Sequence, residues 1–461
     1  MSPRATTPFP LELLTLLKNC GAMLGAQTLS ALLQLGAMVL VAKHWGPAGN
    51  GAWVVALLLP TLLTTFFNLG INAANVYYLG AQRFSLRQVL ATNGQLFCAL
   101  AVAGLVAGAI LIGFFGERVF PGIEARVLWL ALASYPLSLA LVLLSSVFQG
   151  LQQFKRLNLV MLTQPALLLA AVTLMVLAGV TQVAWLVSAN LLALGMAVAL
   201  AALFLRRAVP VRQGGAGQHA MPPDYGMDKA CLQYSLSYGH KVYLSNLLTL
   251  LQSRADIFLV NLLINPAAAG IYAIAFQLGE KVWMLSHAIS MVILPRLSEL
   301  EGNERRRIEI TTIVSRMVLA ASAVGALLAA ALAWPLIGWL FGEQYHASYL
   351  PFVLLLPGIV ALSSARVIAN DIAARGRPEL NLYMAACAAF LSIAGNWLVL
   401  PHFGILGAAV VTSTVYCIDL LLKMLAYKHL THVSFTSLLC LRRGDLRDVH
   451  GALNKRRPQP A

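Results

Sequence analysis

Long apolar segments separated by short polar stretches run through the chain from one end to the other. Their length and hydropathy predict about twelve helices of the kind that cross a bilayer. The predicted spans are 20–42, 52–80, 91–115, 127–148, 159–179, 183–205, 237–263, 268–294, 312–340, 349–370, 381–400 and 405–427. Lipid offers no hydrogen bonds to the backbone, so each segment must satisfy its own groups as a helix. The segments lack the apolar and polar alternation of transmembrane strands. We therefore expect an all-α polytopic membrane protein.

The distribution of charge orients these helices. The chain has 59% hydrophobic and only 11% charged residues, whereas soluble domains carry about 25% charged residues. If the N-terminus is cytoplasmic, the loops on the opposite side contain only three basic residues, Lys43, Arg118 and Arg126. Because basic residues gather in cytoplasmic loops, both termini are predicted to be cytoplasmic. The net charge of +15 then faces membrane lipids. Its dispersal over many loops argues against a nucleic-acid partner.

The two halves of the sequence resemble each other. Gly46-Pro47 precedes Gly51 in the first half, and Asn265-Pro266 precedes Gly270 in the second. Segments 148–150 and 369–371 correspond with nearly the same offset of about 220 residues, as expected for two parallel repeats of a transporter. The predicted organisation is a six-helix bundle over 1–206, a cytoplasmic linker over 207–232, a second six-helix bundle over 233–430 and a basic amphipathic cytoplasmic tail over 431–461.

Charged residues interrupt the seventh and eighth predicted helices. Arg254 and Asp256 lie in the seventh, and Glu280 and Lys281 lie in the eighth. A charge at the bilayer centre costs about 2.5–3.5 kcal/mol on insertion scales, so each of these residues needs a partner or a watery cavity. One interpretation is a pair of interhelical salt bridges, Arg254 with Glu280 or Asp256 with Lys281. The other is that Arg254 or Lys281 lines a central cavity, and the two interpretations are compatible.

Neutral amides and further acids complete the candidate site. Four amides are candidates for substrate binding, although such amides in membrane helices more often join helices: Asn246, Asn261, Asn75 and Gln27. The candidates for coupling transport to an ion are Asp256, Glu280 and the lone acid Asp419. No nucleophile–base pair, metal-ligand spacing or glycine-rich phosphate loop is evident. We therefore expect no catalytic residues, no metal and no cofactor.

Several motifs together resemble the polysaccharide and oligosaccharide flippases (Wzx-type), within the superfamily that includes multidrug and toxin extruders and peptidoglycan-precursor flippases. They are Ala42-Lys43-His44-Trp45-Gly46-Pro47, Arg254-Ala255-Asp256, Gly270-Ile271-Tyr272-Ala273-Ile274-Ala275 and Pro295-Arg296. Lys43 stands where the family has arginine, which keeps the charge but loses bidentate geometry. The likeness extends over nearly the whole chain.

The resemblance implies a fold like that of the multidrug extruders and a function in surface polysaccharide biosynthesis. The cargo would be a polyprenyl-pyrophosphate-linked oligosaccharide, moved by alternating access across the bacterial inner membrane. Arg254 and Lys281 would offset the desolvation of the pyrophosphate in a cationic cavity. A proton or a sodium ion would drive the cycle, and glycan-assembly proteins would be further partners.

Three alternatives remain open at the level of sequence. A cation-coupled multidrug or toxin extruder would favour acidic and aromatic cavity residues over arginine. A membrane-embedded glycan polymerase or ligase would need a sizeable periplasmic loop, whereas the longest one predicted here is only about a dozen residues long, a length typical of simple connections. A scaffold subunit of a glycan-assembly complex would have no need of the charged seventh helix.

Overall fold

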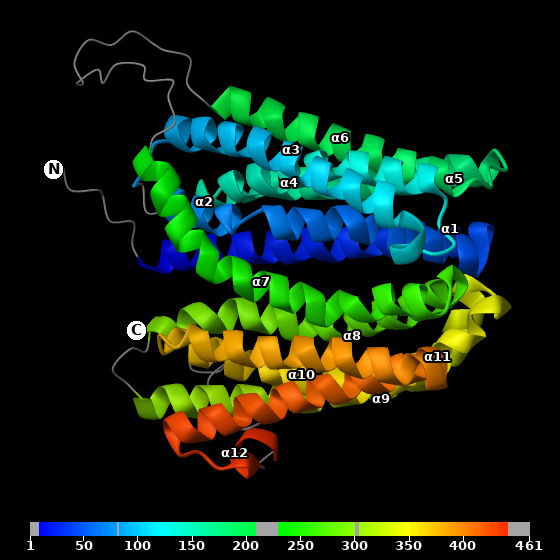
Figure 1. Cartoon of the computed structure of the whole chain (residues 1–461). Coiled ribbons are helices and arrows are strands. Elements are labelled where there is room, and N and C mark those ends of the chain that lie inside the picture. Colours follow the sequence, from blue (N-terminus) through cyan, green and yellow to red (C-terminus); the bar gives the residue numbers. More distant parts are fainter. Residues whose placement is uncertain (1–8, 81–82, 209–228, 300–303, 441–461) are drawn as a thin grey trace, which may run out of the picture. The chain divides into compact units, whose positions relative to one another are not determined.

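The computed structural model describes residues 9–80, 83–208, 229–299 and 304–440 (Figure 1). Within these ranges every extended regular element is helical, and no strand occurs. The side chain of Asn246 lies outside the described residues. The same holds for most of the predicted linker and for residues 441–461 of the predicted tail. Contacts divide the chain into two compact units, residues 1–247 and 248–461. The predicted domain boundaries stay a prediction.

In its described residues, unit 1 contains six helices and the first part of a seventh. The six are α1 (Phe9–Phe67), α2 (Ile71–Gly80), α3 (Leu86–Val119), α4 (Ala125–Gly150), α5 (Phe154–Leu177) and α6 (Val183–Ala208). Helix α4 packs against α1, α2, α3 and α6, and α5 packs against α1 and α6. Ser85 begins α3 with a capping box, in which its hydroxyl accepts from the Gln88 backbone N–H and its own N–H donates to the Gln88 side chain.

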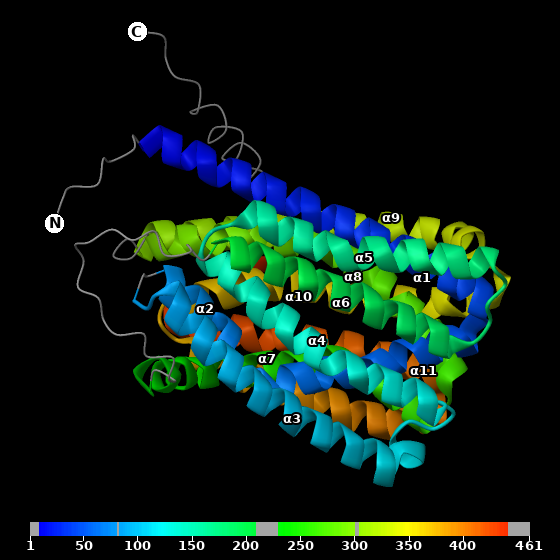
Figure 2. The same ribbon diagram turned by 90° about the horizontal axis from the view of Figure 1, so that it is seen from above.

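Unit 2 begins within α7 (Lys229–Leu263). Its other elements are α8 (Pro266–Glu299), α9 (Glu304–Phe341), the 3-10 helix η1 (Glu343–Ser348), α10 (Tyr349–Ala374), α11 (Pro378–Thr431) and the short α12 (Phe435–Leu439). Helix α10 packs against α8, α9 and α11, so it forms the centre of this unit. Figure 2 shows the same helices turned by 90°.

Two helices are broken at glycines that lie between two predicted spans. Helix α1 covers the predicted spans 20–42 and 52–80 up to Phe67, and it is broken at Gly46 with φ 66°. Helix α11 covers the spans 381–400 and 405–427, and it is broken at Gly404 with φ 56°. Positive φ is strained for residues with a Cβ, so glycine is favoured at both breaks. Each broken helix therefore supplies two of the predicted spans.

The helices present apolar side chains to their surroundings. Eight described helical segments are long and apolar enough to cross a membrane. Large apolar side chains such as Phe114, Leu192, Leu327 and Phe390 are exposed, whereas the interior holds buried polar residues. This arrangement suits a lipid solvent and confirms the predicted all-α polytopic membrane fold. The cytoplasmic location of the termini stays a prediction.

Candidate functional site

The charged residues of α7 and α8 meet in unit 2. Arg254 Nη2 donates to Glu280 Oε1 over 3.0 Å, and the two side chains are 30% and 29% exposed. The Arg254 guanidinium also lies over the ring of Phe276, 5.3 Å from its centre, a favourable cation–π contact. One of the two predicted salt bridges is therefore present. Partial exposure of both ends leaves Arg254 accessible to a competing anion.

Asp256 has hydroxyl partners instead of the predicted lysine. Its side chain is fully buried at 0% exposure. The carboxylate accepts from the backbone N–H of Ile257 over 2.8 Å, from the hydroxyl of Tyr272 over 2.7 Å and from the hydroxyl of Thr412 over 3.2 Å. The pairing of Asp256 with Lys281 is not formed, because these groups already surround the carboxylate. Asp256 thus joins α7, α8 and α11 through hydrogen bonds.

A polar stripe on α11 continues from Thr412. The stripe consists of residues spaced by three or four positions, which places them on one helix face: Thr412, Tyr416, Asp419, Lys423 and Tyr427. Tyr416 lies between Thr412 and Asp419 on this face and is buried. Asp419 is not the lone acid that the sequence predicts, because its Oδ2 accepts from Lys423 Nζ over 2.5 Å.

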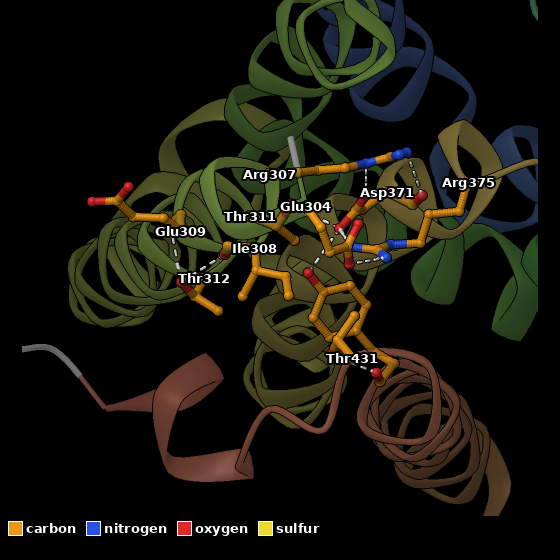
Figure 3. A network of polar contacts seen from close by, with 10 residues as sticks. Glu304, Arg307, Ile308, Glu309, Thr311, Thr312, Asp371, Arg375 and Thr431 are labelled. Carbon is orange, nitrogen blue, oxygen red and sulfur yellow. Dashed lines mark hydrogen bonds and ion pairs between the residues drawn. The ribbon is translucent and has the colours of Figure 1, made fainter. Parts of the chain in front are cut away.

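At the far end of the stripe, Tyr427 reaches a second polar cluster where α9 begins and α10 ends (Figure 3). The carboxylate of Asp371 is fully buried. It accepts from Arg307 Nε over 2.6 Å, from Thr311 over 3.0 Å, from Arg375 over 3.2 Å and from Tyr427 over 2.7 Å. Two arginines and two acids, counting Glu304 on Arg375, balance in charge. The cluster therefore ties α9, α10 and α11 together.

Arg375 stays charged in this cluster, just beyond the membrane-spanning part of α10. Burial alone would lower the pKa of its guanidinium. The hydrogen bond to Glu304 and the charge of Asp371 outweigh burial, and they raise the pKa of Arg375 above its ordinary value. The cluster is thus a set of permanent ion pairs, with no vacant cation to bind a ligand.

The predicted amides occupy several environments. Asn75 of α2 is buried, and its Nδ2 donates to Ser146 Oγ of α4 over 2.9 Å. The contact joins α2 to α4, as is common for such amides in membrane helices. Gln27 of α1 is half-buried. Asn261 of α7 is fully buried, and neither of its amide atoms has a hydrogen-bond partner among the described residues.

Lys281 points away from these groups. It follows Glu280 on α8, yet it lines an apolar cavity formed with α9 and α10. Among the described residues no carboxylate lies within ion-pair distance of Lys281. The three charged residues therefore differ in their surroundings. Arg254 is paired with Glu280, and Asp256 is buried without a hydrogen-bonded cation. Lys281 has no carboxylate within ion-pair distance among the described residues.

Sequence reasoning missed Tyr272, Thr412 and Asp371 as functional groups. Tyr272 lies in one of the quoted motifs, and Asp371 in one of the repeated segments, but neither position reveals its partner. The α11 stripe was detectable from its spacing of three and four. In the described part of the chain, no group of three or more His, Cys, Asp or Glu side chains is placed to hold a metal.

Comparisons with known proteins identify the sequence family that this chain resembles. The family model described as "polysaccharide biosynthesis protein" matches residues 16–301. The capsular polysaccharide biosynthesis protein CapF of Staphylococcus aureus is 25% identical over 150 residues, which cover 32% of this chain and 38% of that protein. The probable low-salt glycan biosynthesis flippase Agl15 of Haloferax volcanii is 25% identical over 173 residues, 36% of each chain. The matches thus span little more than a third of these relatives.

Solved structures share the fold over nearly the whole chain. An inward closed structure of the lipid II flippase MurJ has a TM-score of 0.71 at 13% identity, covering 94% of this chain and 93% of that one. An inward-facing MATE multidrug resistance transporter has a TM-score of 0.64 at 13% identity, covering 87% and 94%. At this identity the likeness establishes the fold alone.

Proposed function

The chain belongs to the family of polysaccharide biosynthesis proteins, and we propose that it flips a polyprenyl-pyrophosphate-linked oligosaccharide across the bacterial inner membrane. The observation that carries the proposal is the family match over residues 16–301. A relative named as a probable glycan flippase supports the same activity. The multidrug extruders share the fold, so fold alone leaves that activity as the alternative.

Arg254 is the group that would receive the pyrophosphate. Its guanidinium is held by Glu280 and Phe276 but is still partly exposed. A pyrophosphate carries more negative charge than one carboxylate and accepts bidentate hydrogen bonds, so it competes with Glu280 for Arg254. Exchange of the two anions would keep Arg254 paired with Glu280 before and after the cargo passes, which limits the cost of an unpaired charge in the membrane.

Asp256 is the acid that would couple this cycle to a proton or a sodium ion. Of the three predicted coupling acids, Glu280 is paired with Arg254 and Asp419 with Lys423. Asp256 has only hydroxyl and backbone donors as hydrogen-bond partners. A bound proton or cation would neutralise this buried carboxylate. Binding or release of that ion would then change the hydrogen bonds by which Asp256 joins α7, α8 and α11.

The test is export in cells that lack the gene. Such cells should retain lipid-linked glycan on the cytoplasmic leaflet, and the wild-type chain should restore surface polysaccharide. Arg254→Ala should lower export about tenfold or more, as expected when a charge-assisted contact is lost. Arg306→Ala is the matched control, because Arg306 forms an exposed pair with Glu309. Full export by Arg254→Ala at normal protein level would contradict the role of Arg254.

The cargo distinguishes the proposed flippase from the alternative, a multidrug extruder. Purified protein in liposomes should move a fluorescent lipid-linked oligosaccharide, and organic cations should neither compete with it nor accumulate. Cation accumulation without movement of the lipid would identify a multidrug extruder and overturn the proposal.

A further inference from the structure

An apolar cavity of about 310 Å³ lies inside unit 2 between α8, α9 and α10. Its walls include Leu278 and Val282 of α8, Ala333 and Ile337 of α9, and Phe352 of α10. Among the described residues that line it, Lys281 is the one that carries a charge. Protein interiors are normally close-packed, with few voids of this size. The cavity is thus large enough to receive part of a ligand.

The two repeats differ at the place of this cavity. In unit 1 the corresponding junction is filled. A Cβ added to Gly108 of α3 would meet Leu132 of α4 at 2.3 Å and Leu63 of α1 at 3.1 Å. Shifted by the repeat offset of about 220 residues, these three positions become Ala329, Phe352 and Val282, and all three line the cavity. One repeat therefore closes this junction and the other leaves it open.

The cavity borders the lipid-facing surface. Leu336 of α9 lines the cavity and is 42% exposed, whereas Ala333, Ile337 and Phe341 are buried. On the same helix Leu328 and Leu332 are exposed large apolar residues. A hydrocarbon chain could therefore enter sideways from the bilayer, and it would contact apolar atoms along its length.

The depth of Lys281 determines which lipid fits. Lys281 is thirteen residues from each end of the predicted span 268–294, which corresponds to about 20 Å along a helix in each direction. The hydrocarbon core is about 30 Å thick, so Lys281 lies near its centre. The wall residues that belong to α9 extend to the last residue of that helix, Phe341. Ser348 of η1 donates to the Ile271 carbonyl near the start of α8, so these ends lie on one side of the membrane.

We propose that this cavity holds the isoprenoid chain next to the phosphate of the lipid carrier, with Lys281 contacting that phosphate. An ordinary phospholipid keeps its phosphate at the membrane surface, far from a lysine within the hydrocarbon core. Only a lipid whose head group crosses the membrane brings a phosphate to this depth. With the phosphate at Lys281 and the chain toward Phe341, the lipid keeps the orientation that it has in the leaflet at the opposite end of α8. By the predicted topology, that leaflet is the cytoplasmic one.

The inference rests on the proposed function for the identity of the lipid, and it deepens it. Arg254 is paired with Glu280, but Lys281 has no carboxylate partner among the described residues. The two cations would serve successive positions of one head group. Arg254 exchanges its carboxylate for the anion, whereas Lys281 gains a counter-charge that it lacks in the unloaded protein.

The experiment uses the full chain in lipid nanodiscs and a polyprenyl monophosphate that carries a photoreactive diazirine on its second isoprene unit. Cross-linking should map to α8, α9 or α10 around the cavity. Ala333→Phe, which fills the cavity, and Lys281→Gln should each lower labelling about tenfold, the loss expected for one contact to a charged group. Lys281→Arg should retain labelling. Leu332→Phe, on the exposed side of the same helix, is the matched control.

Three results would overturn the inference. The first is equal labelling by a diazirine phosphatidylglycerol, which would identify a resident phospholipid. The second is equal labelling by the polyprenol without phosphate, which would remove the role of Lys281. The third is unchanged labelling in both Ala333→Phe and Lys281→Gln. Because Ala333→Phe can fail to fold, the Lys281→Gln result decides when that variant does not elute as a single species.

The proposed function and the lipid site can each be contradicted without the other. If wild-type protein labels at the cavity but exports no glycan, the flippase proposal is wrong and the lipid site stands. If export proceeds while labelling ignores Lys281 and Ala333, the lipid site is wrong and the flippase proposal stands.

Discussion

Arg307 of α9 and Asp371 of α10 form a buried ion pair, in which Arg307 Nε donates to Asp371 Oδ1 over 2.6 Å. A second hydrogen bond runs from Arg307 to the Asp371 carbonyl. The same carboxylate accepts hydrogen bonds from Thr311, Arg375 and Tyr427 (Figure 3). One side chain thus connects three helices of unit 2, and it is satisfied on both oxygens.

We expect Asp371→Asn to destabilise unit 2 strongly. The amide keeps the shape but leaves Arg307 buried without a counter-charge, which costs about 3–5 kcal/mol for broken buried pairs. Thermal unfolding of the purified protein in detergent should show a markedly lower Tm. The exposed pair of Arg306 and Glu309 provides the control, since Glu309→Gln should change stability by less than about 1 kcal/mol. Equal stability of Asp371→Asn and wild type would show that the cluster contributes nothing.

Charge reversal at the Arg254–Glu280 pair distinguishes a structural role of the pair from a role in transport. Arg254→Glu and Glu280→Arg alone should each lower stability by about 1 kcal/mol or more, because each places like charges together. The double variant restores an ion pair and should regain most of the stability. It should not regain glycan export, because the cation then stands on α8 instead of α7. Export by the double variant would assign the pair a purely structural role.

The cytoplasmic location of the C-terminus and the orientation of the helices can be tested with reporters. Green fluorescent protein fused after the last residue should fluoresce, and alkaline phosphatase fused there should be inactive, because the basic loops are predicted to be inside. Alkaline phosphatase inserted between Gly116 and Arg126 should be active. The reverse pattern at both places would invert the assigned orientation and the leaflet from which the cargo starts.

Leu438 anchors the short α12 to the end of unit 2. Its side chain is buried, and its carbonyl accepts from Ser315, while the carbonyl of Ser437 accepts from Arg316. Leu438→Ala should cost about 2–5 kcal/mol if the cavity cannot collapse. Hydrogen exchange should rise in α12 and at the adjoining part of α9. Thr436→Ala, at an exposed position, should leave exchange unchanged. Similar exchange in both variants would show that α12 is not fixed by Leu438.

The sequence alone predicted most of the helices because a membrane span is a local property of composition. Apolar length identified the spans, including the two halves of α1 and α11 on either side of Gly46 and Gly404. The Arg254–Glu280 pair was also predictable, because two charges in neighbouring spans have few other ways to be neutralised.

The remaining site depends on contacts that no local pattern specifies. Asp256 meets Tyr272 from the next helix, but it meets Thr412 only because α11 packs beside them, and these residues are far apart in sequence. Asp371 and Lys281 differ for the same reason. The first is surrounded by donors from three helices, and the second faces an apolar cavity. Burial and direction of a side chain are tertiary properties, so the sequence alone does not show which charged residues are paired.

Asp256 gives the sharpest test of ion coupling. Asp256→Asn is nearly isosteric, and its amide oxygen can still accept from Tyr272 and Thr412. Only the Ile257 N–H loses its side-chain acceptor, so we expect the protein to fold. Transport of a lipid-linked oligosaccharide into liposomes should lose its stimulation by an imposed proton or sodium gradient, while slow exchange without a gradient persists, because only the titratable or cation-binding group is removed. Asp419→Asn is the matched control, since Asp419 is already neutralised by Lys423. Retained stimulation in Asp256→Asn, together with its loss in Asp419→Asn, would move the coupling site from Asp256 to the α11 stripe.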